Sequence, residues 1–251
     1  MRIAGGLAAA ALASFATACD PPADDPDPQV PECCVEGDCL RILTLGNSIT
    51  QGDDQRQSYR YPLWKGLIDL DWCFDLVGSQ RDNHDGNPEW PDYLGEQFDQ
   101  DHEGHWGWRA NQISDSLAGW LGEYDVDAAL VHIGTNDLRA DDEDPEITAG
   151  EVALIVDELR DANPEVTIFL AQIIPTASPE DIGPIEEYNG LLADLAVEMD
   201  EEGSQIILVD QYEGYDPAEY SHDGLHPNEV GEIVMAARWL EALEGFFGPT
   251  G

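Results

Sequence analysis

The sequence predicts an α/β fold, a three-layer α/β/α sandwich whose central, mostly parallel sheet has five strands. Two observations lead to this prediction. Short apolar segments alternate with longer stretches of helical periodicity, a pattern that places parallel strands in one layer and helices on both of its faces. The length of 251 residues is sufficient for one sizeable domain of this kind and an N-terminal extension.

The expected elements alternate along the chain, each strand being a short apolar run and each helix an amphipathic stretch. The longest connection, residues 80–110, is rich in Gly, Asp, His and Trp, and a long irregular segment in a compact domain usually serves function. In order, strands are expected near 40–45, 75–78, 128–134, 166–173 and 206–210, and helices near 60–70, 111–121, 147–161, 184–202 and 228–246.

Two short motifs, far apart in the chain, carry groups that together suit hydrolysis. Asp223 stands three positions before His226 at the start of the last expected helix. A histidine that takes a proton from a nucleophile needs an acceptor on its other ring nitrogen, and this aspartate can provide one. Ser48 follows the first expected strand in a turn bracketed by glycines, where α/β proteins bind ligands. The sequence therefore predicts Ser48, His226 and Asp223 as a catalytic triad.

Each of these residues also has a simpler interpretation. Serine and aspartate are common in turns, so Ser48 and Asp223 can be turn residues. Asn136, which follows an apolar run, can cap a helix, and Gly107 can be an ordinary loop glycine. Only the joint occurrence of the motifs in one chain favours the catalytic interpretation.

Four segments in the same order resemble the sequence blocks of SGNH, or GDSL-type, esterases. Segments 46–49, 134–137 and 223–227 resemble blocks I, III and V, and Gly107 is the best match for the glycine of block II. Segment 101–109 further resembles carbohydrate esterase family 3, whose characterised members include acetylxylan esterases. The resemblance covers most of the chain after the N-terminal extension and implies the flavodoxin-like SGNH hydrolase fold.

The resemblance also implies a role for each site residue. Ser48 is the expected nucleophile, His226 the general base and Asp223 the group that orients the imidazole. The oxyanion hole is expected from the backbone N–H groups of Ser48 and Gly107 and the side-chain amide of Asn136. Neither a cofactor nor a bound metal is expected for this chemistry.

Two positions depart from the family pattern. Asn47 stands where an aspartate usually precedes the nucleophile, and Trp106 stands where the residue before the block II glycine is often a serine. Neither change removes a catalytic group. Trp106 adds a flat ring that can narrow the acyl pocket or stack on a sugar. Substrate contacts are expected from Trp106, Trp108, Arg60 and Trp90.

The expected reaction is hydrolysis of acetyl esters on a xylan-type polysaccharide or oligosaccharide, through an acyl-enzyme on Ser48. The alternative among enzymes is a general GDSL-type esterase or a lysophospholipase-like hydrolase, although the sequence shows no obvious long apolar lid. A catalytically silent carbohydrate-binding lipoprotein is the alternative from a different class, and the intact Ser48, Asp223 and His226 argue against it. The protein is expected to be a monomer.

Residues 1–18 are expected to be a lipoprotein-type signal peptide and not part of the fold. Their Ala-rich apolar run follows Arg2 and is too short to span a membrane. Residues 16–19 resemble a bacterial lipobox, which would make Cys19 the lipidated N-terminus of an exported, envelope-anchored protein. An ordinary signal peptide is the alternative. Residues 19–39 are then a Pro/Asp-rich, cysteine-containing tether, and residues 40–248 the hydrolase domain.

Composition limits the partners. Asp and Glu number 53 against 10 Lys and Arg, for a formal net charge of −43. Such a surface repels nucleic acid and anionic lipid headgroups, so no nucleic-acid partner is expected, and membrane contact only through the N-terminal anchor.

The cysteines after Cys19 are an even number in an exported chain, which predicts disulfides but leaves their pairing open. Metal binding at these cysteines, at segment 102–105 or at the acidic run 141–144 is the competing interpretation. The spacing at the first two places is not that of common metal sites. The cysteines are Cys33, Cys34, Cys39 and Cys73.

Overall fold

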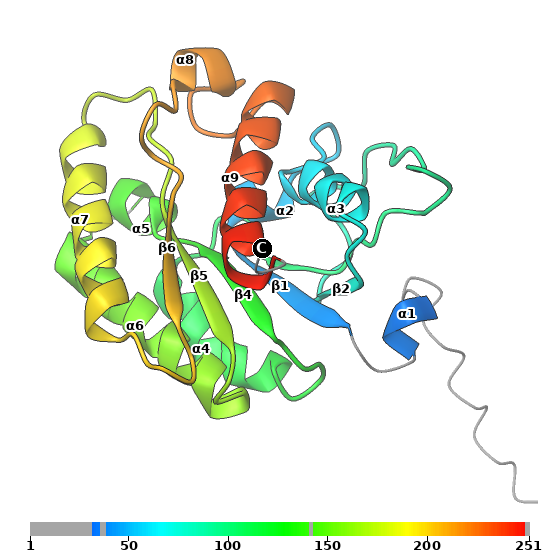
Figure 1. Cartoon of the computed structure of the whole chain (residues 1–251). Helices are drawn as coiled ribbons and strands as arrows, with labels where there is room; N and C mark the ends of the chain where they lie inside the picture. The colour runs from blue at the N-terminus through cyan, green and yellow to red at the C-terminus, as the bar shows by residue number, and fades with distance from the viewer. Residues whose placement is uncertain (1–31, 36–38, 141–142, 249–251) are drawn as a thin grey trace, which may run out of the picture.

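A parallel sheet with the strand order β2-β1-β4-β5-β6 forms the centre of the molecule (Figure 1). The computed structural model describes residues 32–35, 39–140 and 143–248. The five predicted strands are confirmed, and a sixth, β3, pairs with β1. It is only two residues long and polar, so no apolar run in the sequence predicts it. The strands are β1 (Leu40–Gly46), β2 (Phe74–Val77), β3 (Glu103–Gly104), β4 (Ala128–His132), β5 (Thr167–Gln172) and β6 (Ile206–Asp210).

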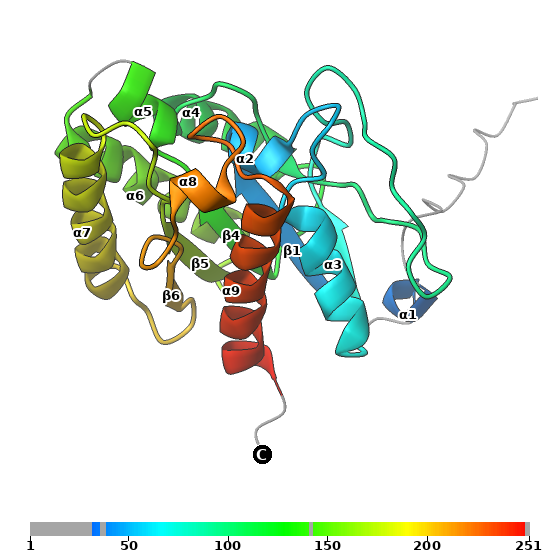
Figure 2. The ribbon, with the colours of Figure 1, turned by 90° about the horizontal axis from the view of Figure 1, so that it is seen from above.

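Helices cover both faces of the sheet, which confirms the predicted three-layer sandwich (Figures 1 and 2). One face carries α3 (Arg60–Asp69) and α9 (Glu229–Phe247), and the other carries α4 (Ala110–Trp120), α6 (Pro145–Ala162) and α7 (Ile182–Glu198). In the described part of the chain, four short helices have no periodic signal in the sequence because each is under two turns long. They are α1 (Glu32–Val35), α2 (Ser48–Gln51), α5 (Thr135–Ala140) and α8 (Pro217–Tyr220).

The alternation of side chains along β1 divides the interior into two cores. Leu43 and Leu45 point to the core beneath α4, α6 and α7, while Ile42 points to the core beneath α3 and α9. All three are fully buried. Because a strand buried on both faces must be apolar throughout, this segment reads as a continuous apolar run, and its carboxyl end is rigidly placed.

The register of the sheet brings three functional turns together. Gly46, the last residue of β1, lies opposite Gly104 of β3 and His132 of β4. The turns that follow these three residues carry Ser48, Gly107 and Asn136, respectively. A Cβ atom at Gly46 would lie 2.3 Å from the carbonyl oxygen of His132, so only glycine allows this close approach.

Two disulfides hold the start of the described chain against the domain. Cys33 pairs with Cys73, which precedes β2, and Cys34 pairs with Cys39. The structure thus defines the pairing that the sequence left open. Because all four of these cysteines form disulfides, none has a free thiolate that could bind zinc. Cys33, near the end of the predicted tether 19–39, is thus covalently tied to the domain through Cys73, and the boundary of the tether stays a prediction.

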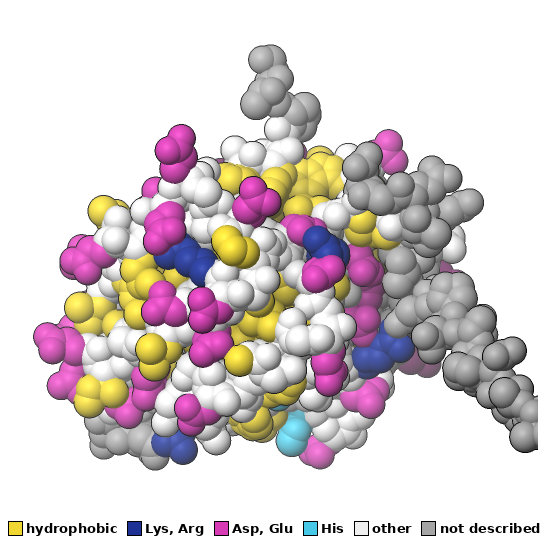
Figure 3. All heavy atoms as spheres, turned by 90° about the horizontal axis from the view of Figure 1, so that it is seen from below, with side chains coloured by type: hydrophobic (Ala, Val, Ile, Leu, Met, Phe, Trp, Pro, Cys, Tyr) yellow, Lys and Arg dark blue, Asp and Glu magenta, His cyan; other side chains and the backbone are white. Residues whose placement is uncertain are grey.

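The predicted signal peptide and the lipidation site Cys19 lie outside the described residues. Among the residues that the structure does describe, no helix has both the length and the apolar character needed to cross a bilayer. Figure 3 shows Asp and Glu side chains scattered over one face of the molecule with few Lys or Arg among them. The strong negative charge is therefore carried on the surface.

Candidate active site

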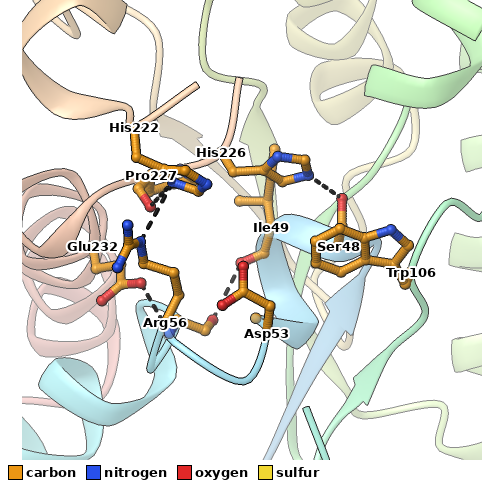
Figure 4. Close-up of a pocket in the computed structure, with 11 residues that line it drawn as sticks. Ser48, Ile49, Asp53, Arg56, Trp106, His222, His226, Pro227 and Glu232 are labelled. Atoms are coloured by element: carbon orange, nitrogen blue, oxygen red, sulfur yellow. Dashed lines mark hydrogen bonds between the residues drawn. The ribbon is translucent and has the colours of Figure 1, made fainter. Parts of the chain in front are cut away.

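A serine, a histidine and an aspartate from two distant segments of the chain form one line of hydrogen bonds, and Figure 4 shows the contact between Ser48 and His226. The Oγ of Ser48 lies 2.9 Å from Nε2 of His226, and Nδ1 of that imidazole lies 2.8 Å from Oδ2 of Asp223. Ser48 and His226 are 178 positions apart in sequence. The fold therefore assembles the three residues that the sequence predicts as a triad.

The Asp223 carboxylate is arranged to stay ionised. Partial burial by itself raises its pKa, but hydrogen bonds from the His226 ring and from two backbone N–H groups outweigh burial and lower the pKa to about 2. Its Oδ1 accepts from the N–H of Leu225 at 2.9 Å and of His226 at 2.7 Å. The Asp-x-x-His spacing thus lets one carboxylate bind both the backbone and the ring of the same histidine.

Ser48 is the first residue of α2, and its position is fixed by the residue before it. Asn47 caps α2, because its Oδ1 accepts from the N–H of Ile49 at 3.0 Å. Asparagine serves this purpose as well as aspartate, so the departure from the family pattern at this position preserves the cap. Ser48 is 5% exposed and lines a pocket.

The turn that follows β3 carries Gly107, the predicted oxyanion-hole glycine, directly after Trp106 of the pocket. Gly107 has a φ of +76°, a left-handed conformation that favours glycine. Among the described residues, the N–H groups of Gly107 and Ser48 have no hydrogen-bond partner. Asn136, on α5, donates from Nδ2 to the carbonyl of Trp108 at 2.8 Å, which ties the end of β4 to this turn. No acceptor within the described ranges binds its second amide hydrogen.

A buried glutamate holds the same turn in place through hydrogen bonds. Glu103 is fully buried and accepts from the N–H and Oγ of Ser79, at 2.9 and 2.7 Å, and from the hydroxyl of Tyr124. Nε2 of His105 lies 2.7 Å from its Oε1. His105 in turn stacks between Trp108 and another tryptophan. No motif in the sequence indicates that this glutamate holds the loop.

A small pocket opens beside Ser48 and contains charged groups that sequence reasoning missed (Figure 4). Arg56, His222 and Glu232 line it together with the triad serine and histidine. Glu232 accepts from the N–H of Ser58 at 3.1 Å, and its burial raises the pKa of its carboxyl to about 7, while Arg56 works in the opposite direction. The sequence did contain a signal for this residue, because Glu232 lies on the buried stripe of α9 that continues through Met235, Ala236 and Trp239.

The four residues expected to bind substrate lie in different surroundings. Trp106 lines the pocket. Trp108 stacks on His105, with ring centroids 4.4 Å apart, and Trp90 packs in an aromatic cluster on Phe98. These two rings therefore pack against the protein itself and do not line the pocket.

The expectation that Arg60 contacts the substrate requires a correction, because this side chain is fully buried. Its guanidinium donates to the carbonyl oxygens of Thr50, Gln51 and Gln100 and to Oδ1 of Asn83, at 2.6 to 3.0 Å. Desolvation lowers its pKa to about 10. The side chain thus holds the nucleophile turn from behind and has no donor directed at the pocket.

The metal interpretation of segment 102–105 is replaced by internal contacts. Nδ1 of His102 accepts from the N–H of Gly104 at 2.9 Å, and His105 binds Glu103.

Residues 141–142 of the acidic run lie outside the described residues. Nearby, Asp137, Glu143 and Glu151 bring one carboxylate oxygen each within 4.8 Å of the others. Burial raises the pKa of Asp137 to about 6 and that of Glu151 to about 7, so these two carboxyl groups keep a proton to higher pH than an ordinary carboxyl does.

Comparison with known proteins agrees with this geometry. A sequence profile of the GDSL-like lipase/acylhydrolase family matches residues 44–232, and the chain belongs to this family. A multidomain esterase of Ruminococcus flavefaciens is 28% identical over 247 residues, which cover 87% of this chain and 30% of that protein. The chain thus spans less than a third of the length of that curated relative.

Two solved structures share the fold closely. A carbohydrate esterase family 3 structure from Talaromyces cellulolyticus is 26% identical with a TM-score of 0.73, and it covers 84% of this chain and 100% of its own. A mutant acetyl esterase with an acetate ion is 25% identical with the same TM-score and the same coverage. The expected SGNH-type α/β fold and the resemblance to carbohydrate esterases are therefore confirmed at the level of family and fold.

Proposed function

We propose that this protein is a serine esterase that removes acetyl groups from a xylan-type polysaccharide or oligosaccharide. The observation that carries the proposal is the hydrogen-bonded line from Ser48 through His226 to Asp223, with the serine open to a pocket. Family membership supports ester hydrolysis in general. The acetyl group and the carbohydrate are supported by what the two similar structures are.

In the first half of the reaction, Ser48 Oγ attacks the ester carbonyl carbon and its proton passes to Nε2 of His226. The imidazolium then returns this proton to the oxygen of the leaving alcohol as the carbon–oxygen bond breaks, which leaves an acyl group on Ser48. Asp223 stays ionised throughout and stabilises the imidazolium through Nδ1.

In the second half, a water molecule attacks the acyl carbon and gives its proton to His226. The proton then passes to Ser48 Oγ as the acyl–serine bond breaks, and acetate leaves. In both halves the carbonyl oxygen becomes negative. The N–H groups of Ser48 and Gly107 and the free amide hydrogen of Asn136 are the donors that would stabilise this charge.

The surroundings of Ser48 favour a short acyl group and a polar alcohol. The pocket at the serine is small, with Ile49, Trp106 and Pro227 among its walls. Arg56 and Glu232 supply a donor and an acceptor on the side of His226, where the leaving alcohol must receive its proton. A long lipid chain would meet charged groups there, so the lysophospholipase-like alternative is less well supported.

The test compares the purified protein with its Ser48→Ala variant on three substrates: acetylated xylan, p-nitrophenyl acetate and p-nitrophenyl octanoate. We expect release of acetate from xylan and rapid cleavage of the acetyl ester, both lost in the variant. Preference for octanoate would instead support the general or lipid-type esterase. An inactive parent that binds xylan would support the catalytically silent carbohydrate-binding protein.

We also propose an exported, monomeric protein that is anchored by lipid at Cys19. The two disulfides are compatible with an oxidising compartment, where such bonds persist. Partition of the full-length chain into detergent phase that is abolished by Cys19→Ala, with a monomeric mass for the soluble domain, is the expected result. A soluble full-length protein would contradict the anchor.

A further inference from the structure

Four aromatic rings from three separate segments stack in a column that includes the imidazole of His226. Their order is His84, Trp106, His226, His222. Successive ring centroids are 4.3, 4.9 and 5.9 Å apart, and successive planes are inclined by 13°, 16° and 23°. Figure 4 shows the indole of Trp106 beside Ser48 and His226, with which it lines the pocket.

No hydrogen bond from a described residue restrains His226 perpendicular to its ring plane, and Trp106 contacts the imidazole from that direction. Both ring nitrogens of His226 are fixed in the ring plane, one by Ser48 and one by Asp223. In-plane bonds leave the tilt of the ring unrestrained, and the indole restrains it by lying flat on the face. The backbone of Trp106 is itself fixed, because its N–H donates to Oε1 of Gln51 at 2.8 Å.

The indole also has an electrostatic effect on the proton acceptor. When His226 takes the proton from Ser48 it becomes a cation, and the face of an indole ring attracts a cation at this separation. A neutral imidazole gains much less. The contact is therefore stronger in the charged state that forms during both halves of the reaction, which is the condition for a contact to raise the rate.

Other charged groups face the same imidazole and set the background. Asp223 favours the imidazolium, whereas a protonated His222 would oppose it. Arg56 adds positive charge behind His222, with Nε 3.5 Å from Nδ1. Trp106 differs from all of these because its indole neither carries a charge nor titrates. Further groups in the surroundings are Asp53 and Glu232 in the pocket and the His84–Asp85 pair on the far face of the indole.

We propose that Trp106 is a positioning residue for His226, which holds the plane of the imidazole and stabilises its protonated form, and that His84 supports the indole from its other face. The proposal rests on the proposed role of His226 as general base. It also replaces the expectation that Trp106 stacks on a sugar, because both faces of its ring are already covered.

The test measures kcat/KM for p-nitrophenyl acetate between pH 4 and 9 in Trp106→Leu, which keeps an apolar side chain without a π face, and in Trp106→Phe. We expect Trp106→Leu to lose about 10-fold in rate and its acid limb to move about 0.5 to 1 pH unit lower. Trp106→Phe should retain most of the rate. Trp108→Leu is the matched control, because this ring stacks on His105 and should leave the acid limb in place.

A rate loss in Trp106→Leu with an unmoved acid limb would mean that the residue only maintains structure, and the proposal would fail. His84→Ala should lower the rate and move the acid limb in the same direction as Trp106→Leu does, but by a smaller amount. If neither the rate nor the acid limb changes, His84 has no part in the proposal. An NMR titration of the His226 ring, with Ser48→Ala as the parent, provides a second measurement that needs no turnover. There, Trp106→Leu should make the ring titrate at lower pH even if the proposed esterase activity fails.

Discussion

Two histidine–carboxylate pairs in this protein have nearly the same nitrogen–oxygen distance but differ in what they do. His226 binds Asp223 at 2.8 Å, and His105 binds Glu103 at 2.7 Å. The side chains of the first pair are 18% and 44% exposed, whereas those of the second are 9% and 0% exposed. The chemistry of the contact is the same, so the contact alone does not identify a catalytic pair.

What distinguishes the pairs is the remaining hydrogen-bonding capacity. His226 still offers Nε2 to Ser48, which faces a pocket. His105 is enclosed between two tryptophan rings, and Glu103 already accepts hydrogen bonds from Ser79 and Tyr124. The buried and enclosed pair maintains the loop, whereas the pair whose second ring nitrogen meets a hydroxyl in a pocket can transfer a proton.

The largest expected effect comes from His226→Ala. Removing the general base should lower kcat/KM for p-nitrophenyl acetate by about 10⁴- to 10⁶-fold. The melting temperature should change little, because the ring is partly exposed and stabilises no core. A variant that unfolds instead would erase the distinction between the two pairs. Steady-state kinetics and a thermal melt check both parts.

Glu103→Ala should have the opposite profile. It removes the acceptor of four partly or fully buried groups, at a cost of about 3 to 5 kcal/mol in the free energy of unfolding. Glu198→Ala, at an exposed glutamate of α7, is the matched control and should change stability by less than about 0.5 kcal/mol. Urea unfolding measures both. Equal stability of the two variants would show that the buried pair is dispensable.

Asn136→Ala tests the link between the two regions, since Asn136 binds the carbonyl of Trp108, which stacks on His105. Loss of one oxyanion donor should lower kcat by about 10²- to 10³-fold with KM nearly unchanged. A fall in melting temperature without this loss of kcat would assign Asn136 to the loop and remove it from the oxyanion hole.

The smallest effect concerns Glu232, a buried carboxylate of the pocket that has no histidine partner. Burial raises its pKa from the ordinary 4.5 to about 7, so between these pH values the folded chain keeps a proton that the unfolded chain has lost. Its contribution to stability is therefore fully present below about pH 4.5 and is lost as pH rises through about 7.

Glu232→Gln removes this titration. The difference in unfolding free energy between parent and variant should therefore change by about 2 to 3 kcal/mol from pH 4 to pH 8, in the direction that penalises the parent at high pH. Glu229→Gln, at an exposed glutamate in the first turn of the same helix, should show no such trend. A pH-independent difference for Glu232→Gln would mean that its carboxyl is ionised in both states.

Much of the fold and the triad could be predicted because their signals are local. β1 and β4 are apolar runs because both of their faces are buried, and α6 and α9 are long enough to display a periodic pattern. Asp223 and His226 meet within a single turn, so their spacing alone predicts the contact.

The surroundings of these residues could not be predicted, because they depend on segments that meet only in three dimensions. Arg60 resembles a surface cation in sequence, yet it is buried behind the nucleophile turn. Trp106 resembles a sugar platform, yet His84 and His226 cover both of its faces. For an aromatic or charged residue, the neighbours decide the role.

The sequence by itself thus determined the layered α/β architecture, the identity of the serine, histidine and aspartate, and the turn chemistry that presents them. Only the tertiary structure decided which carboxylate–histidine pair stays open, which rings face the pocket, and how the cysteines pair. The physical reason is that periodicity and turn preference act over a few residues. Burial, by contrast, depends on contacts between positions as far apart as Ser48 and His226.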